Sequence, residues 1–222
     1  MAEHMQDEEQ IEAIKQWWQE NKVSVVAAFV IAVGGTLGWS QYTDYSATQA
    51  AGAANRYDTV IEQKDTLGTE ELASLVNDLR ENHDGSVYAD FASMQLASAA
   101  VAEGDYDLAA AQLTEVVGEL DPSSTMGQMA QLRLARVLAA AGREEEAVRI
   151  LEMGSASFPV SFAQALGDIH LAAGRESEAL EAYRMAQSAS LDMGRAPGFL
   201  ELKVTALELR LSGAVASEGV LQ

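Results

Sequence analysis

The sequence predicts an all-α protein in which one N-terminal transmembrane helix is followed by a soluble array of helix hairpins. Three observations lead to this prediction. A run of 21 residues, 23–43, carries no charged side chain; apolar residues recur at helical spacing after it; and a short glycine-to-alanine motif occurs three times. Ala, Leu, Glu, Gln and Arg dominate the composition, and no alternating run of β-branched residues suggests a sheet.

The uncharged run is long enough to be a membrane anchor, because about 20 helical residues span a hydrocarbon core of ~30 Å. Trp17 and Trp18 precede it, and Trp39 and Tyr42 stand near its other end. Tryptophan and tyrosine collect at the headgroup level of membranes. The preceding segment is acidic and the run exceeds the apolar core of a signal peptide, so we expect a retained anchor.

Two lysines predict the orientation of the anchor. Lys15 and Lys22 lie on its N-terminal side, whereas the first basic residue on the other side is Arg56. Loops rich in Lys and Arg stay in the cytoplasm. The chain therefore divides into a cytoplasmic tail at 1–22, a transmembrane helix at 23–43 and a domain at 44–222 on the far side.

Two features around the anchor allow two interpretations each. The apolar positions within 11–18 recur at helical spacing, which fits either a separate amphipathic helix on the membrane surface or an extension of the anchor helix. Gly34 and Gly38 are spaced so that another helix could approach closely, but small residues are also common in membrane helices generally.

The repeated motif predicts helix–turn–helix hairpins, after two further helices expected at 46–64 and 69–82. Each copy has a glycine and, five residues later, an alanine: Gly104 and Ala109, Gly142 and Ala147, Gly174 and Ala179. A glycine can end a helix in a left-handed conformation. Acidic residues such as those at 144–146 then suit the start of the next helix, and the small alanine lets the two helices pack closely.

The glycines are 38 and 32 residues apart, and this pattern resembles the tetratricopeptide repeat. The third copy fits best, because Leu166-Gly167-x-x-His170 stands where that family has Leu-Gly-x-x-Tyr. Pro159 follows Ala147 by twelve residues, as the repeat prescribes. No tryptophan opens a unit. The first spacing, of 38 residues, is four residues longer than the usual spacing of about 34, and the extra residues fall near a turn at 121–124. The resemblance implies a tetratricopeptide-like α-solenoid, in which several hairpins must stack.

The same resemblance implies a partner groove on the concave face, which fixed positions of each unit's first helix line. These positions are Phe91, Met94, Met129, Leu132, Arg136, Gln164 and Asp168. Four of the seven are apolar, as a groove for extended or unfolded polypeptide would require. Two other interpretations fit an apolar stripe equally well: a C-terminal helix near 200–211 covers it, or it belongs to the core between helices.

Composition and spacing argue against catalysis and against nucleic-acid binding. The net charge is −20, without a basic stripe, and there is no cysteine. His4 falls in a tail expected to be disordered, His83 in a loop and His170 at a packing position, and none has a partner at metal-ligand or catalytic spacing. No phosphate-binding loop or nucleophile motif occurs. We expect a protein that is not an enzyme and has no metal and no cofactor.

The whole chain also resembles the YfgM family, ancillary subunits of the bacterial Sec translocon. The matching segments are Ile11-Glu12-Ala13-Ile14-Lys15 with Trp17-Trp18 and Glu20-Asn21, Gly38-Trp39, Tyr88-Ala89-x-Phe91-Ala92-Ser93 with Leu96-Ala97, and Leu132-Arg133-Leu134-Ala135-Arg136-Val137. The resemblance implies an inner-membrane protein with a cytoplasmic N-terminus and a periplasmic domain. It also implies association with the translocon and with a membrane-anchored periplasmic chaperone.

This resemblance leads to the functional expectation that the protein helps pass secreted chains from the translocon to periplasmic chaperones. The alternative is a membrane-anchored scaffold that assembles another cell-envelope complex, because a fold does not fix a function.

Overall fold

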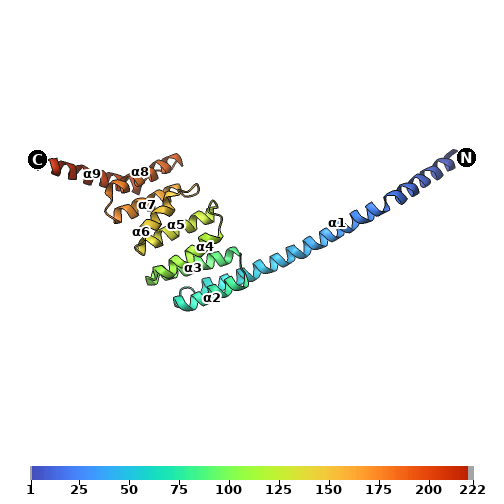
Figure 1. Cartoon of the computed structure of the whole chain (residues 1–222), viewed down its shortest axis with the longest axis horizontal. Helices are drawn as coiled ribbons and strands as arrows, with labels where there is room; N and C mark the ends of the chain where they lie inside the picture. The colour runs from blue at the N-terminus through green and yellow to red at the C-terminus, as the bar shows by residue number, and fades with distance from the viewer. Residues whose placement is uncertain (1, 220–222) are drawn as a thin grey trace. The chain divides into compact units, whose positions relative to one another are not determined.

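The structure is a computed structural model that describes the backbone of residues 2–219 and the side chains of residue 11 and residues 14–213. Within these residues the chain is all-helical and contains no strand, so the predicted fold class is confirmed. The helices, labelled in Figure 1, are α1 (Ala2–Gln63), α2 (Thr69–Asn82), α3 (Val87–Glu103), α4 (Tyr106–Glu119), α5 (Thr125–Ala140), α6 (Glu144–Glu152), α7 (Pro159–Ala172), α8 (Glu176–Asp192) and α9 (Phe199–Gly219).

Contacts divide the chain into two units, Met1–Gly52 and Ala53–Gln222, and the described residues of the first unit all belong to α1. Among the described residues, α1 supplies the one helix long and apolar enough to cross a membrane, with a mean hydropathy of 1.8 over its most apolar window. The residues at 11–18 continue this helix and do not form a separate surface helix. The backbone around His4 is also helical, where the sequence suggested disorder, because neither glycine nor proline occurs before Gly34.

The second unit begins with a core cluster that joins the end of α1 to α2 and α3. Ala53 and Val60 of α1 pack with Leu72, Val76 and Leu79 of α2, and with Ala89, Ala92 and Leu96 of α3. The α2 residues recur at positions i, i+4 and i+7, which places them on one face of the helix. This α2 helix has the bounds expected from the sequence.

The three predicted turn glycines end α3, α5 and α7 in the same geometry. Gly104, Gly142 and Gly174 have φ values of +82°, +77° and +74°, a left-handed conformation that favours glycine. At the first turn, the Gly104 N–H donates to the carbonyl of Val101 at 3.1 Å, and the Asp105 N–H to that of Ala100 at 2.8 Å. This pair of bonds satisfies carbonyls at the helix end and recurs at the other two turns.

A fourth turn of this kind follows α8 and was not predicted. The N–H of Gly194 donates to the carbonyl of Leu191 at 2.8 Å, and that of Arg195 to Ser190 at 2.9 Å. The glycine-to-alanine motif does not continue after Gly194, so the sequence pattern did not reveal the turn.

The helices of the second unit pack in chain order, and α5 also contacts α7 (Figure 1). Residues of α3 to α7 share one core cluster, and α8 and α9 form another with residues of α7. The motif alanines Ala109, Ala147 and Ala179 have no exposed surface. Each lies in the first turns of a hairpin's second helix, where a methyl side chain leaves room for the preceding helix.

Candidate membrane and protein-binding surfaces

The aromatic residues that flank the apolar run are exposed. Trp17, Trp18, Trp39 and Tyr42 expose between 48% and 71% of their surface, and the rings of Trp39 and Tyr42 lie 6.4 Å apart. The apolar side chains between them are also exposed, such as Ile31 at 74%. No described part of the chain covers these side chains, and an apolar surface of this length suits lipid.

Gly34 and Gly38 lie on the same exposed helix. A β-carbon added at either position would have no neighbouring atom within 4 Å. The space beside both glycines is therefore open, and their contact with another membrane helix stays a prediction.

Two of the seven predicted groove residues belong to the core. Met94 exposes 3% and Leu132 7% of its surface, and both lie in the cluster built by α3 to α7. Their side chains fill the space between neighbouring helices and offer little surface to a partner. For these two positions the structure favours the interhelical core, which the sequence had left open.

The other five predicted groove residues are more accessible. Phe91 of α3 is half-buried, and its ring lies 6.1 Å from that of Tyr57 at the end of α1. Met129 and Gln164 are also half-buried, whereas Arg136 and Asp168 are exposed.

Two cavities lie along α3, α5 and α7, and both are lined by Arg136. One, of about 360 Å³, lies between α3 and α5, and its lining includes Met94 and Arg133. The other, of about 290 Å³, lies between α5 and α7, and its lining includes Asp168. Arg136 lines both. Arg133 was not predicted; its Nη1 donates to the sulfur of Met94 at 3.5 Å, a contact between helices that no local pattern reveals.

The C-terminal helix α9 reaches the edge of this surface. The Tyr183 hydroxyl donates to Asp168 Oδ1 at 2.6 Å, and Lys203 of α9 pairs with the same oxygen while its Nζ lies 4.7 Å from the centre of the Tyr183 ring. Burial, followed by the Asp168 hydrogen bond, raises the pKa of Tyr183, which keeps the hydroxyl protonated as a donor. α9 therefore covers part of the α7–α8 hairpin, close to the predicted groove residue Asp168.

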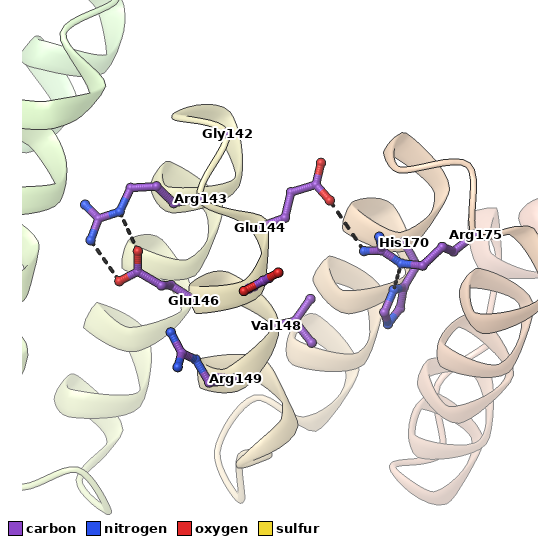
Figure 2. Close-up of a pocket in the computed structure, with 9 residues that line it drawn as sticks. Gly142, Arg143, Glu144, Glu146, Val148, Arg149, His170 and Arg175 are labelled. Atoms are coloured by element: carbon purple, nitrogen blue, oxygen red, sulfur yellow. Dashed lines mark hydrogen bonds and ion pairs between the residues drawn. The ribbon is translucent and has the colours of Figure 1, made fainter.

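A charged cavity of about 730 Å³, shown in Figure 2, is lined by α6 and by the turns after α5 and α7. Arg143 donates from Nε and Nη2 to the two carboxylate oxygens of Glu146, at 2.7 and 2.8 Å. This bidentate pair lowers the pKa of Glu146. Arg175 donates to Nδ1 of His170 at 3.1 Å and pairs with Glu144 at 3.5 Å. The arginines neutralise these carboxylates within the cavity, and the described residues include no cluster arranged to hold a metal ion.

A second charged network, centred on Arg80, joins α2, α3 and α4. The Arg80 guanidinium, whose side chain is only 13% exposed, donates to the Ser93 hydroxyl at 3.1 Å and pairs with Glu115 at 2.8 Å and also with Glu119. Asp90 lies beside them, and burial together with the charge of Glu119 raises its pKa. The sequence did not predict this network, because its members come from three helices.

Comparison with known proteins agrees with this architecture. The tetratricopeptide repeat-like domain family matches residues 15–209. A relative from Aggregatibacter actinomycetemcomitans is 30% identical over 84% of this chain and 91% of its own length, and is named an ancillary SecYEG translocon subunit. Relatives with the same name from Haemophilus influenzae and Escherichia coli are 29% and 23% identical, over 84% and 66% of this chain and 91% and 69% of their own lengths. No solved structure matches the chain.

Proposed function

Since this chain belongs to the family of ancillary SecYEG translocon subunits, we propose that it is a membrane-anchored binding protein without enzymatic activity that associates with the Sec translocon. We further propose that it helps pass secreted proteins to periplasmic chaperones, including one anchored in the membrane. The observation that carries the proposal is how much of the relatives is matched. The alignment covers 91% of the length of two of them, and this chain combines the anchor and the repeats as one polypeptide.

The proposed location is the bacterial inner membrane, with residues 1–22 in the cytoplasm, 23–43 in the bilayer and 44–222 in the periplasm. Support comes from the exposed apolar stretch of α1 and from Lys15 and Lys22 on its N-terminal side. This arrangement puts the repeat domain on the side where secreted chains emerge.

The proposed binding surface is the face along α3, α5 and α7 that contains the two cavities. It combines apolar lining, such as Val101 at 38% exposure, with the guanidinium groups of Arg133 and Arg136. An extended polypeptide offers apolar side chains and backbone carbonyl oxygens, which arginine can bind as a donor. Arg136 is the best candidate contact because it is exposed and lines both cavities.

Photo-crosslinking in cells tests this surface. A photoreactive residue at Arg136 should capture a secreted polypeptide or a periplasmic chaperone. The control position is Asp107, which is exposed on α4 outside both cavities and should capture neither. Equal capture from the two positions would show that the α3–α5–α7 face is not the binding surface.

A further inference from the structure

A second groove lies between α6 and α8 over the floor made by α7, outside the face described above. Its volume is about 530 Å³, within the range of binding clefts in proteins. The groove is lined by apolar side chains from all three helices, among them Leu151 of α6, Leu166 of α7 and Met185 of α8. α6 has nine residues and ends at Glu152, whereas α8 has seventeen residues.

One face of α8 presents both the apolar wall and the acidic rim of this groove. Glu178, Ala182, Met185 and Ala189 follow each other at intervals of four, three and four residues, so they share one side of the helix. Met185 is 57% exposed although it lines the groove. A flexible thioether in this position can adapt to an incoming apolar side chain.

The charges around the α6–α8 groove are not balanced within the protein. Its lining contains the exposed carboxylates of Glu152, Glu178 and Glu181 but no lysine or arginine. None of the ion pairs among the described residues includes these three glutamates. In the neighbouring charged cavity of Figure 2, by contrast, arginines pair with Glu144 and Glu146. His170 lines both spaces and marks the border between them.

We propose that the α6–α8 groove binds a segment of a partner polypeptide in which large apolar side chains are flanked by lysine or arginine. Apolar side chains of the segment enter between Leu166 and Met185, and its basic side chains pair with the rim glutamates. A second copy of this chain is a poor occupant, because each copy has a net charge of −20. The inference is independent of binding at the α3–α5–α7 face.

The test uses the full chain in nanodiscs of zwitterionic lipid and a fluorescent peptide of sequence GKKLFLKKG. We expect saturable binding that weakens as ionic strength rises. Two further peptides separate the contributions: GEELFLEEG lacks the basic charge and GKKSGSKKG lacks the apolar centre, and each should bind at least tenfold more weakly.

Matched variants locate the site on the protein. The double variant Glu178→Lys/Glu181→Lys should reduce the affinity at least tenfold, whereas Glu70→Lys/Glu71→Lys changes the net charge equally on α2 and should leave it within twofold. Met185→Ser should also weaken binding, and Met153→Ser, at a position 67% exposed that does not line the groove, should not. Every position substituted in these variants is exposed, so folding should persist.

Three results would overturn the proposal. Binding could stay within twofold in both the Glu178/Glu181 and the Met185 variants. The α2 charge reversal could weaken binding as much as the groove reversal, which would indicate attraction to overall negative charge only. The peptide without apolar side chains could bind as tightly as the first, which would remove any role for the apolar wall.

Discussion

The ring of Tyr183 on α8 lies directly against the α-carbon of Gly167 on α7. A β-carbon at Gly167 would be 2.6 Å from both Cδ1 and Cε1 of that ring, and Tyr183 has no exposed surface. The close approach of α7 and α8 therefore requires glycine at this position. The hydroxyl end of Tyr183 is fixed in turn by Asp168, so one aromatic side chain joins the core of the third hairpin to its surface.

Gly167→Ala should destabilise the protein although alanine favours helices. The added methyl group would force the buried Tyr183 ring or the helix to move, and such overpacking typically costs ~1–3 kcal/mol. Thermal unfolding measures the effect. The control is Gly118→Ala on α4, where a β-carbon would meet no atom within 4 Å, so stability should be unchanged or rise by up to ~1 kcal/mol. Equal melting temperatures for both variants would contradict the packing described.

Ala147→Leu and Ala179→Leu should each lower the free energy of unfolding by ~1–3 kcal/mol. Both alanines are fully buried where the second helix of a hairpin meets the first. Denaturant titration of each variant measures the change. Ala102→Leu is the control, because Ala102 is exposed on α3 and should tolerate the larger side chain. If the buried and exposed variants unfold at the same denaturant concentration, the alanines are not close-packing positions.

Asp90→Asn should stabilise the protein at neutral pH. Burial and the nearby Glu119 raise the folded-state pKa of Asp90, so its charged form is disfavoured in the folded protein above that pKa. As the pH falls from neutral toward this pKa, the native protein takes up a proton and the advantage of the variant should shrink. Melting temperatures measured from about pH 7.5 to pH 4.5 test this expectation, with the exposed Asp58→Asn as control. A pH-independent difference would show that the Asp90 charge is not the cause.

The N-terminus should lie in the cytoplasm, because Lys15 and Lys22 resist transfer across the membrane. A reporter enzyme that is active only in the periplasm should work when fused after residue 222 and remain inactive when fused before residue 1. The reverse pattern of activity would show the opposite orientation.

The sequence was most informative where one physical cause acts locally. An uncharged run with flanking tryptophans predicts the anchor helix, and a glycine five residues before a small buried alanine predicts a hairpin, as at Gly142 and Ala147. Such patterns depend on helix geometry and solvent, which are the same in any protein. The fold class and the turns at Gly104, Gly142 and Gly174 could therefore be predicted, whereas the turn at Gly194 could not.

The binding surface could not be predicted in the same way. An apolar residue on the first helix of a hairpin, such as Met94 on α3, can face either a groove or a neighbouring helix. Only the packing of the whole helix array decides between these two positions. The Arg80 network and the α6–α8 groove depend on residues brought together from three helices. No spacing along the chain indicates such contacts.

We propose that this chain acts as a subunit at the Sec translocon. Affinity purification of the full chain from membranes in mild detergent, followed by mass spectrometry, will show whether it does. A variant in which residues 23–43 are replaced by an unrelated transmembrane helix serves as a control for the contribution of the anchor. We expect SecY and a membrane-anchored periplasmic chaperone to co-purify with the native chain. Co-purification of a different envelope complex without SecY would contradict it and would favour a scaffold elsewhere in the envelope.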